Sequence, residues 1–356
     1  MDNLPSLRYI RAKKNKWLAC ASLHSLRHLL KLPPGAFTDP EKSKSYSVFT
    51  IKKKSGADRI IENPAENLKA LQRSINNYLQ AVHYFVKHPA SYGFCMNVKN
   101  DGFPCNVYTH ALQHTGANFL INADLQDFFH AVSWQKAYDV FSASPFIHDK
   151  ESTVWLTNVC THAGRLPMGA PTSPVIGNLA ATGLDHSLES LAKKSHCTYT
   201  RFADDISFSS RLPYPPTLKD EILQSIRDHG FDPNMQKVKE FGKGDVKIIT
   251  GLVVNEHVRL GGSYWAKTDM LVNQLGALQC LMRKDPSMAV HTQVEDIKER
   301  VNGFLAFAQM IGGAENDKID QVQSKLDNME EELEIFESLA WDEIPYINMK
   351  HHATDH

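Results

Sequence analysis

Long apolar runs, paired cysteines and an excess of charge are all missing from this 356-residue chain. No apolar stretch approaches the roughly 18 residues that cross a bilayer, and the first residues hold no apolar segment like a secretory signal. The six cysteines include no C-x-x-C pair, which argues against a zinc ribbon or a disulfide framework and suits a reducing cytosol. These absences predict a cytoplasmic protein without a membrane partner.

The net charge is −1, but the charges are unevenly placed along the chain. Residues 1–75 hold 15 Lys and Arg against 6 Asp and Glu, whereas residues 314–356 hold 3 against 12. A polyanion responds to the local field within about 10 Å, so a basic end matters more than the neutral sum. The composition, with 42% hydrophobic residues, is that of a globular protein with a sizeable core.

Hydrophobic spacing predicts an α+β chain in three parts. The expected parts are a basic helical segment at 1–45, a mixed segment at 46–260 and a helical segment with an acidic end at 261–356. Strands or hairpins are expected at 47–61, 119–125, 199–209 and 248–254. Helices are expected within 7–31, at 68–82, from 134 to 141, at 175–191, at 218–229 and at 315–340.

Three acids at the ends of apolar strands carry the chemistry. Asp204 and Asp205 stand between two short strands, and Asp124 ends another strand about eighty residues earlier. If those strands are neighbours, three carboxylates converge, which is what two-metal phosphoryl transfer requires. Carboxylate oxygens are the ligands that Mg²⁺ prefers. The simpler alternative is that these residues are surface aspartates in turns.

The motifs around these acids resemble, in order, those of prokaryotic reverse transcriptases of the retron type, over roughly residues 45–260. The matching segments are 124–129, 166–174, 202–205, 230–237 and 249–255. The resemblance implies a right-hand polymerase, with fingers and palm at 46–260 and a helical thumb at 261–356. It also implies two Mg²⁺ ions, or Mn²⁺, as cofactors.

The resemblance assigns roles to individual residues. Catalytic roles fall to Asp124, Asp204, Asp205 and Lys237, the last as proton donor to pyrophosphate. The two ions would be held by Asp124, Asp204, Asp205 and Leu125. The dNTP would contact Lys53, Arg59, Leu125, Phe129, Met168 and Gly169. RNA or primer would contact His114, Thr250 and Gly251. Arg59 is the stronger candidate in the first hairpin, because a guanidinium binds phosphate with two parallel hydrogen bonds.

Four positions depart from the family pattern. Met168 stands where the family usually has Gln, Phe202 where it has Tyr, and Ile249 where it has Val. His110 replaces the Asn of an Asn-Ala-x-x-His motif that ends at His114. The i, i+4 spacing of the two histidines also suits a metal site, but no third ligand is evident. Structural hydrogen bonding or RNA contact is the preferred interpretation.

The leading hypothesis is an RNA-directed DNA polymerase that copies a structured non-coding RNA, with a primer, into cDNA from dNTPs. The resemblance places it in a retron anti-phage defence system with an effector or toxin protein. One alternative is a defence or abortive-infection reverse transcriptase that makes untemplated, repetitive or protein-primed DNA. Another is a catalytically silent RNA-binding scaffold for an effector. The sequence shows no evident RNase H, integrase, maturase or toxin domain.

Overall fold

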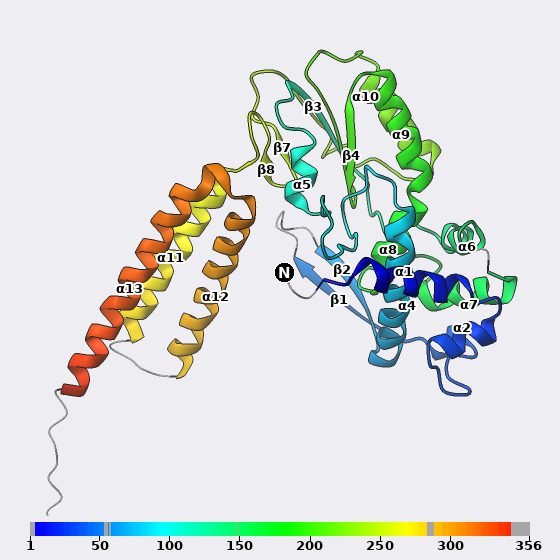
Figure 1. The fold of residues 1–356 in the computed structure, drawn as a ribbon, viewed down its shortest axis with the longest axis horizontal. Coiled ribbons are helices and arrows are strands. Elements are labelled where there is room, and N and C mark those ends of the chain that lie inside the picture. Colours follow the sequence, from blue (N-terminus) through cyan, green and yellow to red (C-terminus); the bar gives the residue numbers. More distant parts are fainter. Residues whose placement is uncertain (1–3, 53–55, 57, 147, 283–287, 343–356) are drawn as a thin grey trace, which may run out of the picture. The chain divides into compact units, whose positions relative to one another are not determined.

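The computed structural model describes residues 4–52, 56, 58–146, 148–282 and 288–342. It divides into two compact units, Met1–His257 and Val258–His356, which Figure 1 traces from blue to red. Among the helices described, none combines the length and the apolar character needed to cross a bilayer.

The centre of the first unit is a four-stranded antiparallel sheet with the strand order β4-β5-β3-β6. Its strands are β3 (Phe119–Asp124), β4 (Thr198–Phe202), β5 (Asp205–Ser210) and β6 (Lys239–Phe241). Their β-branched and aromatic residues favour extended backbone, and Leu120, Ile121 and Phe208 are buried. The strand and hairpin that carry the three acids are therefore neighbours in one sheet.

Ten helices described in the first unit surround this sheet and extend the unit beyond it. They are α1 (Leu7–Leu18), α2 (Leu23–Leu29), α3 (Pro40–Ser43), α4 (Glu66–Val86), α5 (Val107–Leu112), α6 (Trp134–Ser142), α7 (Lys150–Cys160), α8 (Ser173–Ala180), α9 (Thr182–Lys194) and α10 (Leu218–Asp228). Helix α9 packs against both β4 and α10. The basic α1 packs on α4, where Trp17 stacks on Tyr78 with ring centroids 5.5 Å apart.

Two β-hairpins complete the first unit. Strands β1 (Tyr46–Lys52) and β2 (Asp58–Pro64) pair antiparallel, as do β7 (Ile248–Ile249) and β8 (Leu252–Val253). The single strand predicted over 248–254 is therefore wrong. Positive φ values at Thr250 (47°) and Gly251 (87°) reverse the chain, which a continuous strand cannot do.

Two helical predictions also need correction. The helix expected over 175–191 is divided at Ala181, whose ψ of 0° ends α8 before α9 begins. The helical spacing over 7–31 contains two helices, α1 and α2. The break arises because Ser22 caps α2, its hydroxyl accepting a 3.3 Å hydrogen bond from the Ser25 amide.

The second unit is built from three long helices. Its elements are β9 (Arg259–Leu260), α11 (Gly262–Met282), α12 (Met288–Ile311), the short 3₁₀ helix η1 (Gly313–Glu315) and α13 (Asn316–Asp342). Apolar residues on α11 and α12, among them Leu271 and Val301, are fully buried. Glu315, the first residue of the predicted acidic helix, ends η1 just before α13. It is buried and accepts hydrogen bonds from the Leu260 amide (2.7 Å) and the Trp265 indole (2.8 Å).

Candidate active site

The sheet register brings the three predicted acids to one edge. Asp124 is the last residue of β3 and pairs directly with Asp205, the first residue of β5. Asp204 lies in the two-residue turn between β4 and β5, and its carbonyl accepts a 2.9 Å hydrogen bond from the Leu125 amide. Directly opposed residues have Cβ atoms about 5 Å apart. The hairpin and β3 therefore meet where the carboxylates cluster.

The carboxylates perturb one another. Burial and the negative charge of Asp124 raise the pKa of Asp204. Burial and the charges of Asp204 and Asp124 raise the pKa of Asp205 to about 6, although part of Asp205 reaches solvent. Like charges in a partly desolvated site disfavour the ionised form. A cation bound between these groups would remove that cost.

The ammonium group of Lys237 contacts this cluster of carboxylates. Its Nζ donates a 2.7 Å hydrogen bond to Asp124 Oδ1, and Asn234 Nδ2 lies 3.3 Å from Oδ2. Asp124 raises the pKa of Lys237 through that hydrogen bond. The Asn234 amide also donates to the Asp124 carbonyl at 2.7 Å. Hydrogen bonds from Lys237 and Asn234 thus hold the 230–237 segment against the end of β3.

The residues present suit divalent ions in chemistry, although not in their present spacing. Among the described side chains, no three His, Cys, Asp or Glu stand in metal-ligand geometry. The donors are carboxylate oxygens, which Mg²⁺ and Mn²⁺ prefer. Two of the three carboxyls have raised pKa values, because burial and the neighbouring negative charges disfavour their ionised forms. Asp124 accepts the hydrogen bond from Lys237, and the same carboxylate would be needed to hold an ion. The Leu125 side chain is buried, which leaves its backbone as the only group able to face an ion.

A buried arginine behind the catalytic turn was not assigned a role by the sequence analysis. Arg201 is fully buried, with Nε and Nη2 each 2.7 Å from the two oxygens of Asp185. Its Nη1 donates to the Ala203 carbonyl (2.8 Å) and to Asn178 Oδ1 (2.9 Å). The guanidinium thereby fixes the backbone one residue before Asp204. Arg201 stands two residues after Tyr199 on β4, so both side chains point to the same face of the sheet. That spacing is the sequence signal that could have revealed the buried arginine.

The loop at 89–106 supports the same turn from the other side. Backbone hydrogen bonds join Tyr92 to Arg201 (2.9 Å) and Arg201 to Ala90 (2.8 Å). A Cβ on Gly93 would lie 2.4 Å from the Ala203 nitrogen, closer than side chains approach. Glycine at position 93 is therefore required for this contact.

A second buried cluster joins the β1–β2 hairpin to the 164–172 loop. Glu62 accepts hydrogen bonds from Arg165 (2.9 Å) and from the Met168 amide (3.2 Å), and its amide donates to the Met168 carbonyl (2.7 Å). Burial alone would raise the pKa of Glu62, but the bonds from Arg165 and Met168 hold the pKa below its usual value. The sequence analysis missed Glu62. A Cβ on Gly169, where φ is +136°, would lie 2.7 Å from the Glu62 carbonyl oxygen.

The residues predicted to contact the nucleotide differ in their exposure to solvent. Arg59 is exposed on β2, and its positive charge offsets part of the rise that burial and Asp124 cause in the pKa of Asp204, so its field reaches the catalytic turn. Lys53 lies outside the described residues. Met168 and Phe129 are half-buried, whereas Phe128 is buried. The ring of Phe129 lies 5.9 Å from that of Phe94. The structure thus leaves Phe129 partly accessible and uses Phe128 in the core.

The two histidines form an interior hydrogen-bond network. His110 Nε2 and His114 Nε2 lie 2.7 and 2.6 Å from the Thr200 hydroxyl, and His114 Nδ1 lies 2.7 Å from the Ser209 hydroxyl. Burial lowers the pKa of each histidine to about 3, so both rings are neutral. His114 is 1% exposed, so its imidazole lies in the interior, and its predicted contact with RNA stays a prediction. Of the two preferred interpretations, structural hydrogen bonding agrees with this geometry.

Thr250 and Gly251 form the turn of the β7–β8 hairpin. The Thr250 hydroxyl lies 3.4 Å from His110 Nδ1, which joins the turn to the histidine network. Gly251 is exposed. The network therefore connects α5, two palm strands and this turn, and the turn itself presents backbone to solvent.

Comparison with known proteins identifies the family of the first unit. The family model of the reverse transcriptase (RNA-dependent DNA polymerase) matches residues 51–254. The retron Mx162 reverse transcriptase of Myxococcus xanthus is 32% identical over 239 residues, covering 59% of this chain and 47% of that protein. The retron Ec86 reverse transcriptase of Escherichia coli is 31% identical over 215 residues, covering 59% and 63%. The chain thus spans about half to two thirds of the length of these two relatives.

A third relative is covered more fully. The retron Ec73 reverse transcriptase of Escherichia coli is 30% identical over 288 residues, covering 76% of this chain and 84% of that protein. Among solved structures, apo telomerase from Candida tropicalis aligns with a TM-score of 0.44 and 12% identity, over 66% of this chain and 51% of that chain. The predicted fold class, an α+β right-hand polymerase, is confirmed by the family match and the mixed first unit. The chain therefore belongs to the reverse transcriptase (RNA-dependent DNA polymerase) family and is similar to its retron-type members.

Proposed function

We propose that this protein is an RNA-directed DNA polymerase that copies a structured non-coding RNA into cDNA. The observation that carries the proposal is the meeting of Asp124, Asp204 and Asp205 at one sheet edge, with raised pKa values at the last two. The charged transition state of phosphoryl transfer needs positive charge at such a site. Family membership and the retron relatives support the same reading.

The three carboxylates would hold two Mg²⁺ ions, or Mn²⁺. When bound, those ions would supply Lewis-acid stabilisation of charge on the reacting phosphate and the departing pyrophosphate. Arg59, exposed beside the turn, would bind the triphosphate oxygens through its planar donors. Half-buried Phe129 would face the sugar, and Gly169 would leave room for the nucleotide next to Met168.

Lys237 would act as the proton donor to pyrophosphate. Its pKa is raised by the hydrogen bond to Asp124, which makes it a weak acid in the absence of substrate. Asp124 is also one of the carboxylates that would hold an ion, and without its hydrogen bond to Asp124 the pKa of Lys237 would fall toward the working pH. An acid is most effective when its pKa lies near the working pH. Substrate assembly would thus activate the proton donor.

The biological part of the proposal rests on the resemblance to retron enzymes. In this proposal, the template RNA comes from the same locus, and the RNA–cDNA product acts with an effector protein in anti-phage defence. Sequencing the DNA that copurifies with the full chain tests this part. A unique cDNA joined to RNA is expected, and Asp204→Ala, Asp205→Ala protein should carry none. Homopolymeric or random DNA would instead indicate untemplated synthesis.

A further inference from the structure

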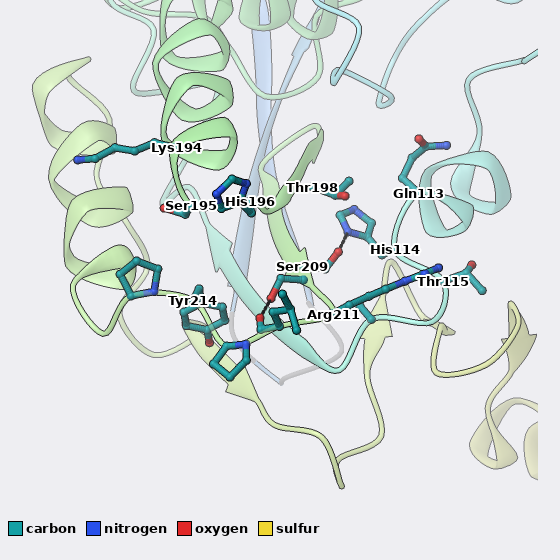
Figure 2. Close-up of a pocket in the computed structure, with 15 residues that line it drawn as sticks. Gln113, His114, Thr115, Lys194, Ser195, His196, Thr198, Ser209, Arg211 and Tyr214 are labelled. Atoms are coloured by element: carbon teal, nitrogen blue, oxygen red, sulfur yellow. Dashed lines mark hydrogen bonds between the residues drawn. The ribbon is translucent and has the colours of Figure 1, made fainter.

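A second concave site lies at the opposite end of the palm strands from the catalytic turn. The β3–β5 register runs from Asp124 paired with Asp205 to Phe119 paired with Ser210. Five residues of antiparallel strand span roughly 17 Å. Ser209 and Ser210 line a pocket of about 750 Å³ at that far end (Figure 2). Pockets of 300–1,000 Å³ are the size that small ligands occupy, so this one has ample room for a single nucleotide.

The charged residues that line the pocket are all positive. The lining includes Lys194 and Arg211 but no Asp or Glu. Lys194 Nζ lies 3.8 Å from Glu221, a loose pair on an exposed surface. Arg211 is exposed, and its guanidinium makes no ion pair with any described residue. A guanidinium without a carboxylate partner at the wall of a pocket is suited to bind phosphate oxygens.

The same pocket offers groups that recognise a base. Tyr214 lines it, held at 6.1 Å from Phe119 in an edge-on arrangement. Burial and Glu240 raise the pKa of Tyr214 to about 12, so its ring stays neutral and suitable for stacking. Gln113 contributes an exposed amide whose Nε2 lies 3.3 Å from the Thr109 carbonyl. Unpaired RNA bases are bound by aromatic stacking together with hydrogen bonds to their edges.

His196 in this lining adopts a backbone conformation that favours glycine. It follows the end of α9 with φ of +51°, and the Cys197 amide donates 2.8 Å back to the Ala192 carbonyl. Helices commonly end this way with Gly, because a Cβ is strained there. His196 is exposed, so packing does not account for its side chain. Strain retained at an exposed imidazole in a pocket suggests a role for the imidazole in binding.

We propose that this pocket binds one unpaired nucleotide of the RNA partner, an inference that rests on the proposed function. Arg211 binds the phosphate, and Tyr214 and His196 contact the base. A duplex backbone cannot enter such a concave site, whereas an unstacked nucleotide can. The pocket would thereby hold a single-stranded part of the RNA away from the catalytic acids.

The test uses the full chain and a fluorescein-labelled 12-nucleotide single-stranded RNA of mixed sequence. Arg211→Gln should weaken binding about fivefold and reduce the salt dependence by about one phosphate contact. Lys193→Gln is the matched control. It removes one cation from the C-terminal end of α9, next to the pocket residue Lys194, but Lys193 pairs with Glu189 and does not line the pocket. It should change affinity by less than about twofold.

His196→Gly separates binding from folding. Relief of backbone strain should raise the melting temperature by about 2 °C, while loss of the imidazole should weaken RNA binding about threefold. With 4-thiouridine in the RNA, photocrosslinks should map to the 194–215 segment. The proposal would be overturned if Arg211→Gln and Lys193→Gln weakened RNA binding equally, or if His196→Gly left the affinity unchanged. It would also be overturned if crosslinks mapped only to other segments, or if a poly-aspartate peptide competed with the RNA equally well. Failure of the proposed function would show separately, as absent primer extension by wild-type protein on poly(rA)/oligo(dT).

Discussion

At the scale of single residues, Asp205 is the most informative side chain, because its ionisation opposes folding. Its pKa in the folded protein is about 6, above the ordinary value. The advantage of the protonated form is complete below the ordinary pKa and is lost as pH rises through about 6. At neutral pH the folded protein therefore bears the cost of an ionised Asp205.

Asp205→Asn should raise the melting temperature at pH 7.5 in EDTA, because the amide is neutral. The gain should shrink toward pH 4.5, where wild-type Asp205 is itself protonated. Mg²⁺ should raise the melting temperature of wild type more than that of the variant. Differential scanning fluorimetry measures all three, with exposed Glu256→Gln as the control. A variant that melts lower than wild type at pH 7.5 would contradict the assigned cause.

Arg201 allows a prediction about stability. Arg201→Met leaves the buried Asp185 with the Tyr199 hydroxyl but without its cationic partner, and loss of one member of a buried ion pair costs about 3–5 kcal/mol. The double variant Arg201→Met, Asp185→Leu should recover part of that loss, because no buried charge remains. Chemical denaturation of the single and double variants gives the coupling. Additive losses would show that the two side chains do not depend on each other.

The three acids could be predicted from sequence because local motifs contain them. The buried residues that hold the surrounding backbone in place could not be predicted. Asp124, Asp204 and Asp205 each follow or precede an apolar strand. The partners of Arg201 and Glu62 lie 16 and more than 100 residues away in the chain, and no local pattern connects such positions. The burial of His114 could not be predicted either, because it depends on Thr200 and Ser209, which reach it only through strand pairing.

At the scale of elements, the close approach of the 89–106 loop to the catalytic turn is the most specific feature of the first unit. Gly93→Ala would place a methyl group 2.4 Å from the Ala203 nitrogen. The loop or the turn must shift, which costs about 1–3 kcal/mol and should lower the polymerisation rate. Gly102→Ala, in the same loop with nothing within 4 Å, should change stability by less than about 0.5 kcal/mol. Similar losses in both variants would show that the loop is generally sensitive instead.

Element boundaries that depend on single backbone conformations escaped the sequence analysis. Periodicity alone does not show the ψ change at Ala181 that divides α8 from α9. Nor does it show the turn at Thr250, because Ile249, Thr250 and Val253 all have side chains that favour strands. The turn is accompanied by tertiary contacts, among them the 3.4 Å contact between Thr250 and His110, that no local pattern reveals.

At the scale of the whole molecule, each compact unit has its own buried core. Leu271, Val301 and other apolar residues bury one another within residues 258–342. A fragment of residues 258–342 should therefore fold alone as a helical protein with a cooperative thermal transition. Circular dichroism of the isolated fragment is the measurement. A non-cooperative melt would show that its core depends on the first unit.

The central claim is that the three carboxylates form one polymerisation site. The most direct test is the single-turnover rate of dNTP incorporation on an RNA template with a DNA primer, in Mg²⁺, for wild type and Asp124→Asn. The claim predicts a loss of about 10³-fold or more, with an unchanged circular dichroism spectrum. An Asp124→Asn rate within tenfold of wild type would contradict it.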